Sequence, residues 1–261
     1  MEATRDPDTL LDVSGASLYV RLVAPHAGRP TIVFLHDSLG CAALWRDFPE
    51  QLAAATRCNY LVYDRQGYGR SAPFDGTPRT KDYLEREAGV LQELLNTLGI
   101  RDAVLFGHSD GGSIALIAAA RYPATVRAVI SEAAHLFVED LTLEGIRAAH
   151  AQYRETNLKE RLGRYHGHKT EALFRAWTDT WLDPAFRDWD ISALLPSVIC
   201  PVLVIQGDAD EYGTLRQVSG ITAGIRGVPQ VCILPGTGHT PHKEAPAETL
   251  HRARQFLSAL Q

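Results

Sequence analysis

The stretch from Val104 to Leu116 constrains the fold of this chain more than any other. Its first residues are apolar, as in a buried strand, and Ser109 follows at a sharp turn from which a helix leaves. Gly107 and Gly111 flank the serine in a G-x-S-x-G pattern, and side chains at these two positions would collide in such a turn. We expect the turn to lift the Ser109 hydroxyl clear of the sheet and to point the following backbone N–H groups toward developing negative charge.

Short apolar runs alternate with helical patterns along most of the chain. Residues 31–35 form a nearly continuous apolar run, which is typical of a strand buried on both faces of a sheet. The expected strands are residues 17–24, 31–35, 59–63, 102–106, 126–130, 198–205 and 228–234, and the expected helices are residues 44–55, 83–98, 215–225 and 250–260. Strands that alternate with helices predict an α/β fold, in which a mostly parallel sheet is covered by helices on both sides.

Polar side chains follow five of the expected strands, at the point where each strand ends. The carboxyl ends of parallel strands meet at one edge of the sheet, and the chemistry of such proteins collects there. The groups are His36-Asp37-Ser38, Asp64-Arg65, Ser109-Asp110, the pair Asp208 and Asp210, and His239. Their expected convergence supports a functional role for Ser109.

A serine hydroxyl is a weak nucleophile on its own. It needs a base within hydrogen-bond reach and a carboxylate that orients this base. On a sheet of this type the expected chain order is serine, then acid, then histidine. Ser109, Asp210 and His239 follow that order, and each comes after an expected strand.

Five segments together make the chain similar to the α/β-hydrolase family from end to end. They occur in the family's order and at similar separations: His36-x-x-x-Gly40, residues 64–71, residues 107–112, residues 207–210 and residues 238–244. The resemblance implies an α/β-hydrolase fold, with a mostly parallel central sheet, helices on both faces and a helical cap. It also implies a triad-based serine hydrolase that needs no cofactor and no metal.

Two members of the expected triad have competitors nearby. The family pattern places the base directly after a glycine, which favours His239 over His242; we interpret His242 as a packing or helix-start residue. Asp210 matches the family position of the acid, whereas Asp208 is better suited to brace the loop. Some relatives place the acid at the end of the preceding strand, where this chain has Glu132, so both alternatives to Asp210 stay open.

The resemblance further implies an oxyanion hole built from two backbone N–H groups. One belongs to Asp110, the residue after the nucleophile, and the other to Ser38. Many relatives have His-Gly where this chain has His36-Asp37, so Leu39 is kept as the alternative second donor. We interpret His36 as a structural histidine that hydrogen-bonds this loop.

The side chain of Asp110 is unusual beside a nucleophile. A carboxylate near a developing oxyanion opposes its stabilisation unless the charge points away or meets a cation. Some amino-acid-ester hydrolases of this fold resemble this chain in having Ser-Asp-Gly-Gly here, so one hypothesis is that Asp110 receives a cationic group of the substrate. The alternative is that Asp110 stabilises the positive end of the following helix.

The segment of residues 135–195 interrupts the strand pattern. It is helical in pattern, falls where relatives insert a cap, and divides the chain into a core of residues 1–134 and 196–261 and a cap of residues 135–195. Phe174, Trp177 and Trp181 lie on one helical stripe. This stripe is expected either to contribute Trp177 and Trp181 to a substrate pocket or to pack the cap itself.

Charge and cysteine content limit the surroundings in which the chain acts. The net charge of −5 argues against a nucleic-acid partner, and we expect no membrane span and no N-terminal leader. The four cysteines lack metal or redox spacing and suit a reducing cytoplasm; they are Cys41, Cys58, Cys200 and Cys232. The His166-x-His168 pair lacks companions for a metal site.

The sequence therefore predicts a cytoplasmic serine hydrolase that cleaves a small carboxylic ester or related acyl bond. The substrate is expected to be a small molecule that is apolar or aromatic in part, and the oligomeric state stays open. Carbon–carbon bond hydrolysis, lactone opening and perhydrolysis use the same triad in relatives. A non-catalytic ligand-binding protein of the same fold is the alternative from another class.

Overall fold

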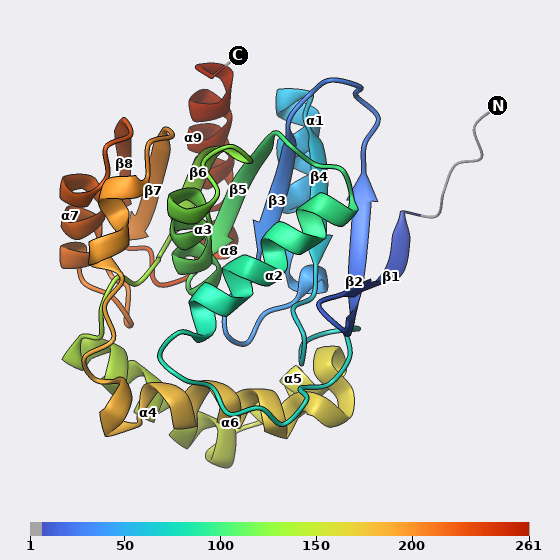
Figure 1. Ribbon diagram of the computed structural model, residues 1–261. Helices are drawn as coiled ribbons and strands as arrows, with labels where there is room; N and C mark the ends of the chain where they lie inside the picture. Colours follow the sequence, from blue (N-terminus) through green and yellow to red (C-terminus); the bar gives the residue numbers. More distant parts are fainter. Residues whose placement is uncertain (1–6, 261) are drawn as a thin grey trace.

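A computed structural model describes residues 7–260, which form one eight-stranded sheet with helices on both faces (Figure 1). The strand order is β1-β2-β4-β3-β5-β6-β7-β8, and the pairs from β4 through β8 are parallel. The strands are β1 (Asp8–Val13), β2 (Ala16–Val23), β3 (Thr31–Leu35), β4 (Asn59–Tyr63), β5 (Ala103–His108), β6 (Val126–Glu132), β7 (Val202–Gly207) and β8 (Pro229–Leu234). The predicted α/β-hydrolase architecture is thereby confirmed.

Strand β1 is the element that the sequence pattern did not reveal. It pairs antiparallel with β2 through a two-residue turn, in which Ser14 and Gly15 have φ values of 54° and 78°. Positive φ at both central residues is the geometry of a type I′ hairpin, whose twist matches that of the flanking strands. Because β1 is an exposed edge strand, with Leu10 60% exposed, its side chains lack the alternation that marks a half-buried strand.

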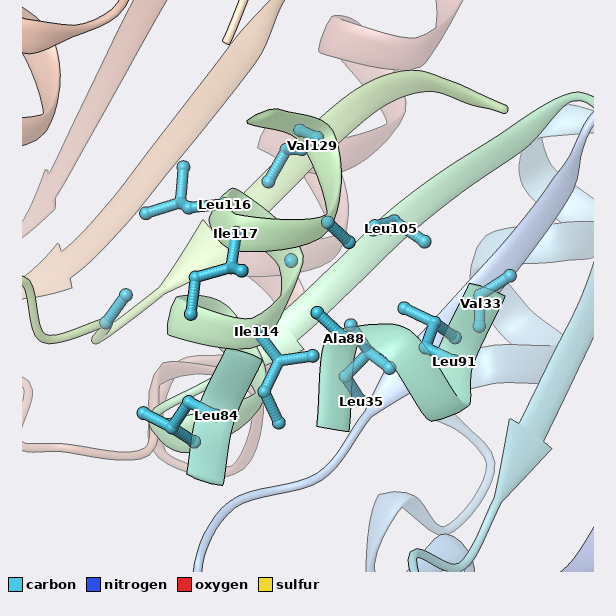
Figure 2. Packing of buried hydrophobic residues seen from close by; sticks show 14 of the residues in the cluster. Val33, Leu35, Leu84, Ala88, Leu91, Leu105, Ile114, Leu116, Ile117 and Val129 are labelled. Atoms are coloured by element: carbon cyan, nitrogen blue, oxygen red, sulfur yellow. The ribbon is translucent and has the colours of Figure 1, made fainter. Parts of the chain in front are cut away.

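The alternation of side chains along the strands divides the core into two layers. Val33 and Leu35 of β3 face one helical layer, whereas Ile32 and Phe34 face the other. The first layer contains α2 (Tyr83–Thr97), α3 (Asp110–Arg121) and α7 (Leu215–Gly224), and the second contains α1 (Phe48–Thr56) and α9 (Pro246–Ser258). Figure 2 shows α2 and α3 packed on the first layer of strand residues. The sheet is thus sealed on both faces, and its carboxyl-end edge is left for a site.

Three helices lie across that edge, below the ends of the strands in Figure 1. They are α4 (Asp140–Glu155), α5 (Leu158–His166) and α6 (Thr170–Trp181), which we call the α4–α6 layer. The Nζ of Lys169, just before α6, donates to the carbonyl oxygens of Tyr68 and Gly69 at 3.0 and 2.7 Å. The division of the chain at residues 135 and 195 into core and cap stays a prediction.

Hydrogen bonds also fasten the start of the α4–α6 layer to the core. Glu139 precedes α4 and accepts hydrogen bonds from the backbone N–H and the hydroxyl of Thr214, at 2.9 and 2.7 Å. The buried Gln217 amide donates to the same carboxylate at 2.9 Å. The layer is therefore held to the core at its start and again between α5 and α6.

Among residues 7–260, no helix combines the length and the apolar character that crossing a membrane requires. Residues 1–6, on which the expectation of no leader partly rests, lie outside the described residues.

Candidate active site

The G-x-S-x-G segment forms the turn between β5 and α3. Ser109 has φ 55° and ψ −120°, which places it in a strained conformation between the strand and the helix. A Cβ at Gly107 would lie 2.1 Å from the carbonyl oxygen of Gly111, and a Cβ at Gly111 would lie 2.0 Å from that of Leu35. The two glycines are therefore a steric requirement of the turn, as the sequence predicted.

Substituting Gly111 with alanine is expected to lower the free energy of unfolding by about 3 kcal/mol, because backbone atoms of β3 cannot move away from the added methyl group. Gly89→Ala in α2 is the matched control, since its Cβ would lie 3.8 Å from the nearest atom, the Tyr122 hydroxyl. Alanine there is expected to raise the stability by up to about 1 kcal/mol. Urea denaturation of both variants measures this difference; equal effects would contradict the steric argument.

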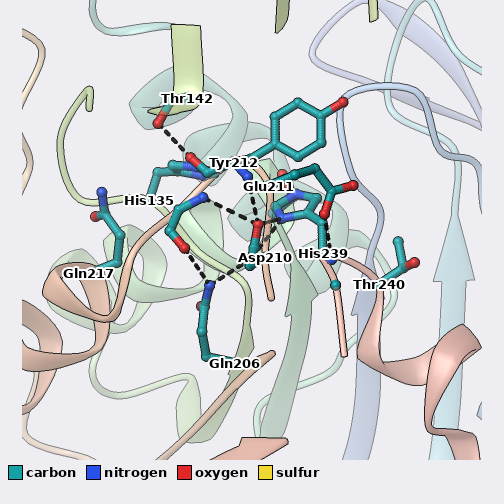
Figure 3. Close-up of polar contacts among 12 residues, drawn as sticks. His135, Thr142, Gln206, Asp210, Glu211, Tyr212, Gln217, His239 and Thr240 are labelled. Carbon is teal, nitrogen blue, oxygen red and sulfur yellow. Dashed lines mark hydrogen bonds and ion pairs between the residues drawn. The ribbon is translucent and has the colours of Figure 1, made fainter. Parts of the chain in front are cut away.

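Ser109, His239 and Asp210 form a continuous line of hydrogen bonds. The Nε2 of His239 lies 3.0 Å from the Oγ of Ser109. Its Nδ1 lies 2.9 Å from each carboxylate oxygen of Asp210, a contact that Figure 3 shows. All three residues are at most 9% exposed. A base between a hydroxyl and a carboxylate is the arrangement that activates a serine.

Asp210 is held in place by donors that the sequence pattern did not reveal. The backbone N–H groups of Tyr212 and Gly213 donate to Oδ1 at 2.8 and 3.2 Å, and the buried Gln206 amide donates to Oδ2 at 2.6 Å (Figure 3). Burial raises the pKa of Asp210, but its hydrogen bond to His239 and the charge of that histidine outweigh burial and lower the pKa below its usual value. The carboxylate is therefore ionised at neutral pH.

The same pair sets the protonation of His239. Burial alone lowers the pKa of this imidazole, yet the hydrogen bond and charge of Asp210, together with the charge of Glu211, raise it above its ordinary value. Two carboxylates thus favour the protonated form of the His239 ring.

The competitors of the triad residues have other partners. Asp208 accepts a hydrogen bond from the backbone N–H of Gly236 at 2.6 Å, and thus braces its loop. Glu132 accepts from the backbone and the ring of His242, at 2.6 and 2.9 Å, so these two residues form a separate buried acid–histidine pair. Among the three acids considered, the structure brings Asp210 to His239.

The expected oxyanion donors lie beside the nucleophile. Asp110 is the first residue of α3, where a backbone N–H has no acceptor within the helix. Within the described residues, no group accepts a hydrogen bond from the Ser38 N–H. The ring of His36 holds this loop, because its Nδ1 donates to the carbonyl oxygen of Asp37 at 2.8 Å and its Nε2 accepts from the N–H of Arg65 at 3.1 Å. Burial keeps the pKa of His36 well below its ordinary value, which matches this tautomer.

A cavity of about 340 Å³ opens onto Ser109 and His239. It is bounded on one side by the sheet edge and on the other by the α4–α6 layer. The residues expected at the substrate line it, namely Ser38, Asp110, Trp177 and Trp181. Sequence reasoning missed further lining residues, including His135, Thr142, Gln152, Arg161 and Tyr212. The cavity wall is accordingly more polar than the aromatic stripe alone implied.

The aromatic stripe of α6 serves two purposes. Phe174 stacks on Tyr153, with ring centroids 3.8 Å apart, and thus packs the α4–α6 layer itself. Trp177 and Trp181 line the cavity, and the Nε1 of Trp181 donates to the hydroxyl of Tyr83 at 2.9 Å. The stripe therefore both packs the α4–α6 layer and lines the cavity, and a role of Trp177 and Trp181 in binding substrate stays a prediction.

Tyr212 connects the α4–α6 layer to Asp210. Its carbonyl oxygen accepts hydrogen bonds from the Thr142 hydroxyl of α4 at 2.6 Å and from the Nε2 of His135 at 3.1 Å (Figure 3). Its backbone N–H donates to Asp210. A single residue therefore bonds both to α4 and to the carboxylate that orients His239.

Among residues 7–260, no group of three or more histidine, cysteine or acidic side chains is arranged to hold a metal ion. His166 ends α5, where its Nε2 donates to the carbonyl oxygen of Leu39 at 3.0 Å and its Nδ1 accepts from the N–H of Gly69 at 3.0 Å. This histidine is thus a structural contact between α5 and two loops of the core.

A mostly parallel sheet that carries a serine at its strand-to-helix turn, within reach of a histidine, is the arrangement typical of alpha/beta hydrolases. The chain belongs to the alpha/beta hydrolase family, whose sequence model matches residues 32–253. It is 31% identical to the serine hydrolase BPHL of Mus musculus, over 94% of this chain and 84% of the relative.

One further relative is similar in sequence, and one solved structure is similar in fold. The chain is 30% identical to a 2-hydroxy-6-oxononadienedioate/2-hydroxy-6-oxononatrienedioate hydrolase of Paraburkholderia phymatum, over 76% of this chain and 77% of the relative. The crystal structure of the enol-lactonase from Burkholderia xenovorans superimposes with a TM-score of 0.76 at 21% identity, over 96% of this chain and all of that one (100%). The structural likeness bears on the fold alone.

Proposed function

We propose that the protein is a serine hydrolase that cleaves a small carboxylic ester or related acyl bond through Ser109, His239 and Asp210. The observation that carries this proposal is the hydrogen-bonded line from Asp210 through His239 to Ser109, with contacts of 2.9 and 3.0 Å. The similarity to a relative named as a serine hydrolase supports it.

In the first half of the reaction, the Oγ of Ser109 attacks the carbonyl carbon of the ester while the Nε2 of His239 takes the hydroxyl proton. The carbonyl oxygen becomes an oxyanion, which the N–H groups of Ser38 and Asp110 stabilise. The imidazolium, stabilised by Asp210, then gives its proton to the departing alcohol oxygen, and an acyl-enzyme remains on Ser109.

The second half releases the acid. His239 removes a proton from a water molecule that attacks the acyl carbon, and the resulting tetrahedral intermediate expels the Oγ of Ser109. The serine regains its proton from His239. Both halves transfer only protons and an acyl group, so the proposed reaction needs neither a redox cofactor nor a metal.

Hydrolysis of a carbon–carbon bond is the second candidate function. One of the relatives is named as the hydrolase of an oxo-dienedioate, a substrate with two carboxylates. Arg161 of α5 lines the cavity and provides a cation that suits a carboxylate. The two candidates share Ser109 and His239, and they differ in the bond that is broken.

The test is covalent labelling of the purified protein with a fluorophosphonate, followed by turnover of aryl esters, simple lactones and a 2-hydroxy-6-oxo-dienoate. We expect labelling and faster turnover of the esters. Turnover of the dienoate alone would support the second candidate. Absence of both labelling and turnover would contradict the proposal and favour a ligand-binding protein.

Asp110 supplies a prediction about the substrate. Its Oδ2 accepts a hydrogen bond from the Tyr83 hydroxyl at 3.1 Å, whereas its Oδ1 has no hydrogen-bond partner among the described residues. We propose that an ammonium group of the substrate donates to this oxygen, as the Ser-Asp-Gly-Gly resemblance suggested. Hydrolysis of an amino-acid ester is then expected to be about 10-fold faster, in kcat/KM, than that of its N-acetyl form, in line with a charge-assisted hydrogen bond.

Asp110→Asn is the control for this comparison, because it keeps the backbone N–H and removes the charge. The variant is expected to hydrolyse the two esters at similar rates. If wild-type enzyme hydrolyses both esters at equal rates, Asp110 does not bind a cation of the substrate.

The cytoplasmic location expected from the cysteines stays a proposal. All four cysteines are free and buried.

A further inference from the structure

A buried guanidinium lies behind the oxyanion loop. Arg65 follows β4, and its side chain is 0% exposed. Its Nη2 donates to the carbonyl oxygens of Asp37 and His36, at 2.9 and 3.2 Å. Its Cζ lies 4.8 Å from the ring centroid of Tyr68. The sequence places Arg65 among the polar groups at the strand ends, and the proposed reaction gives it no part.

The carbonyl that Arg65 contacts most closely belongs to a particular peptide unit. The C=O of Asp37 and the N–H of Ser38 are two ends of one planar amide. Nη2 of Arg65 and Nδ1 of His36 both donate to that oxygen, at 2.9 and 2.8 Å. Two donors at the oxygen fix the plane of the amide, and they polarise it so that its N–H becomes a stronger donor.

The same guanidinium also approaches the other expected donor. Its Nη1 lies 3.9 Å from the Oδ2 of Asp110, whose backbone N–H begins α3. The Tyr83 hydroxyl donates to this oxygen as well, and Trp181 of the α4–α6 layer donates to Tyr83. One side chain thus bonds the peptide unit that carries the Ser38 N–H and lies close to Asp110, the residue that carries the second expected donor.

Stability alone is a poor explanation for this placement. Burying a cation costs free energy that the neighbouring charges, Asp110 at 3.9 Å and Glu87, recover only in part, and an apolar side chain in such a position is often as stable. The Nε and Nη1 of Arg65 have no hydrogen-bond partner in the described chain. The bonds that the guanidinium does make go to the backbone of the loop that ends in Ser38.

We propose that Arg65 is the positioning residue of the oxyanion hole: it orients and polarises the Asp37–Ser38 amide and places a fixed positive charge behind the Ser38 and Asp110 donors. This inference rests on the proposed function, since it concerns the oxyanion of that reaction. A planar guanidinium suits this task because it keeps its charge and its donor directions when buried. Its effect belongs to the transition state, in which the oxyanion carries charge.

The test compares Arg65→Lys, Arg65→Met and the control Arg79→Met. Arg79 is a matched control because it also lies over the Tyr68 ring, at 6.0 Å, and bonds the Tyr68 hydroxyl rather than the oxyanion loop. With the fastest ester, Arg65→Met is expected to lose about 100-fold in kcat, the effect of one lost oxyanion donor, and to keep KM within about 3-fold. Arg65→Lys is expected to recover part of this loss, and Arg79→Met to behave like wild type.

Affinity for a boronic acid, which forms a tetrahedral anion on the serine, is expected to fall in parallel with kcat. Affinity for a non-hydrolysable ketone of the same shape is expected to stay constant. A rise in KM with unchanged kcat, or equal losses in Arg65→Met and Arg79→Met, would overturn the proposal. Thermal unfolding identifies a variant that does not fold. If Arg65→Met does not fold, the kcat and boronic-acid affinity of Arg65→Lys test the proposal in its place.

A second measurement separates this inference from the proposed function. In protein labelled with ¹⁵N-serine, the amide resonance of Ser38 is expected to shift and its hydrogen exchange to accelerate in Arg65→Met but not in Arg79→Met. Without turnover or boronate binding in wild type, the proposed function fails, and the Ser38 resonance still reports whether Arg65 holds the loop. An unmoved Ser38 resonance would overturn the positioning role even in an active enzyme.

Discussion

Ser109→Ala is expected to abolish labelling by a fluorophosphonate and to lower kcat by about 10⁶-fold, the scale found when a triad serine is removed. The reason is chemical: the methyl group cannot form the acyl-enzyme, and the oxyanion donors and substrate contacts that remain account for only a small residual rate. Mass spectrometry of the labelled protein and initial rates with an aryl ester measure both effects.

The control for this substitution is Ser219→Ala. Ser219 is exposed in α7, and its hydroxyl donates to the carbonyl oxygen of Leu215. We expect this variant to label and to turn over as wild type does. Label retained in folded Ser109→Ala would show that another residue is the nucleophile, and the assignment of the triad would then be wrong.

Asp210→Asn is expected to lower kcat by about 10⁴-fold while the protein remains folded. The backbone N–H groups of Tyr212 and Gly213 bind Oδ1 of the native carboxylate, so they retain the amide oxygen of the asparagine in that place. Its NH₂ group then faces the Nδ1 of His239 and favours the tautomer with the proton on Nε2. That tautomer cannot accept the proton of Ser109.

The interaction between Asp210 and His239 predicts the direction in which kcat/KM changes with pH. The reaction needs neutral His239, whose pKa is raised above its ordinary value of 6.5 because Asp210 outweighs the effect of burial. The kcat/KM of wild type is therefore expected to be low in acid and to rise with pH through a midpoint above 6.5. Asp210→Asn removes the main cause of the raised pKa, so its residual activity is expected to rise at a lower pH.

Rate profiles between about pH 5 and pH 9 test this prediction. A wild-type midpoint below the ordinary histidine value would contradict the role of Asp210 as the partner of His239. An unchanged midpoint in Asp210→Asn would assign the rise to a group other than His239, because burial lowers the pKa of the imidazole once the carboxylate charge is gone.

The sequence predicted the inner strands well because they are buried on both faces. The apolar runs at β3 and before Ser109 fit a buried strand better than any other element. The two glycines of the turn are sterically required, and the G-x-S-x-G pattern makes them visible in the sequence. Strand β1 escaped prediction for the opposite reason. An edge strand with exposed side chains has no hydrophobic period that a sequence pattern could show.

The residues around the hydrogen-bonded line of Ser109, His239 and Asp210 were harder to predict than the three residues of that line. Gln206 lies within an apolar strand, and nothing in the local pattern distinguishes it from a buried structural amide. Arg65 reaches a carbonyl 28 residues earlier in the chain, a contact that depends on how two loops after different strands lie side by side. Such contacts follow from the tertiary arrangement, and chain spacing contains no signal for them.

The bond between Thr142 and the carbonyl oxygen of Tyr212 has a consequence for protein engineering. The α4–α6 layer forms the roof of the substrate cavity, so it is the natural segment to exchange between relatives when a new substrate range is sought. Its first helix, however, bonds the same residue whose N–H holds Asp210. A graft of this layer that omits residues 211–214 is expected to inherit a new pocket together with a misplaced acid, so the two segments should be transplanted as one unit.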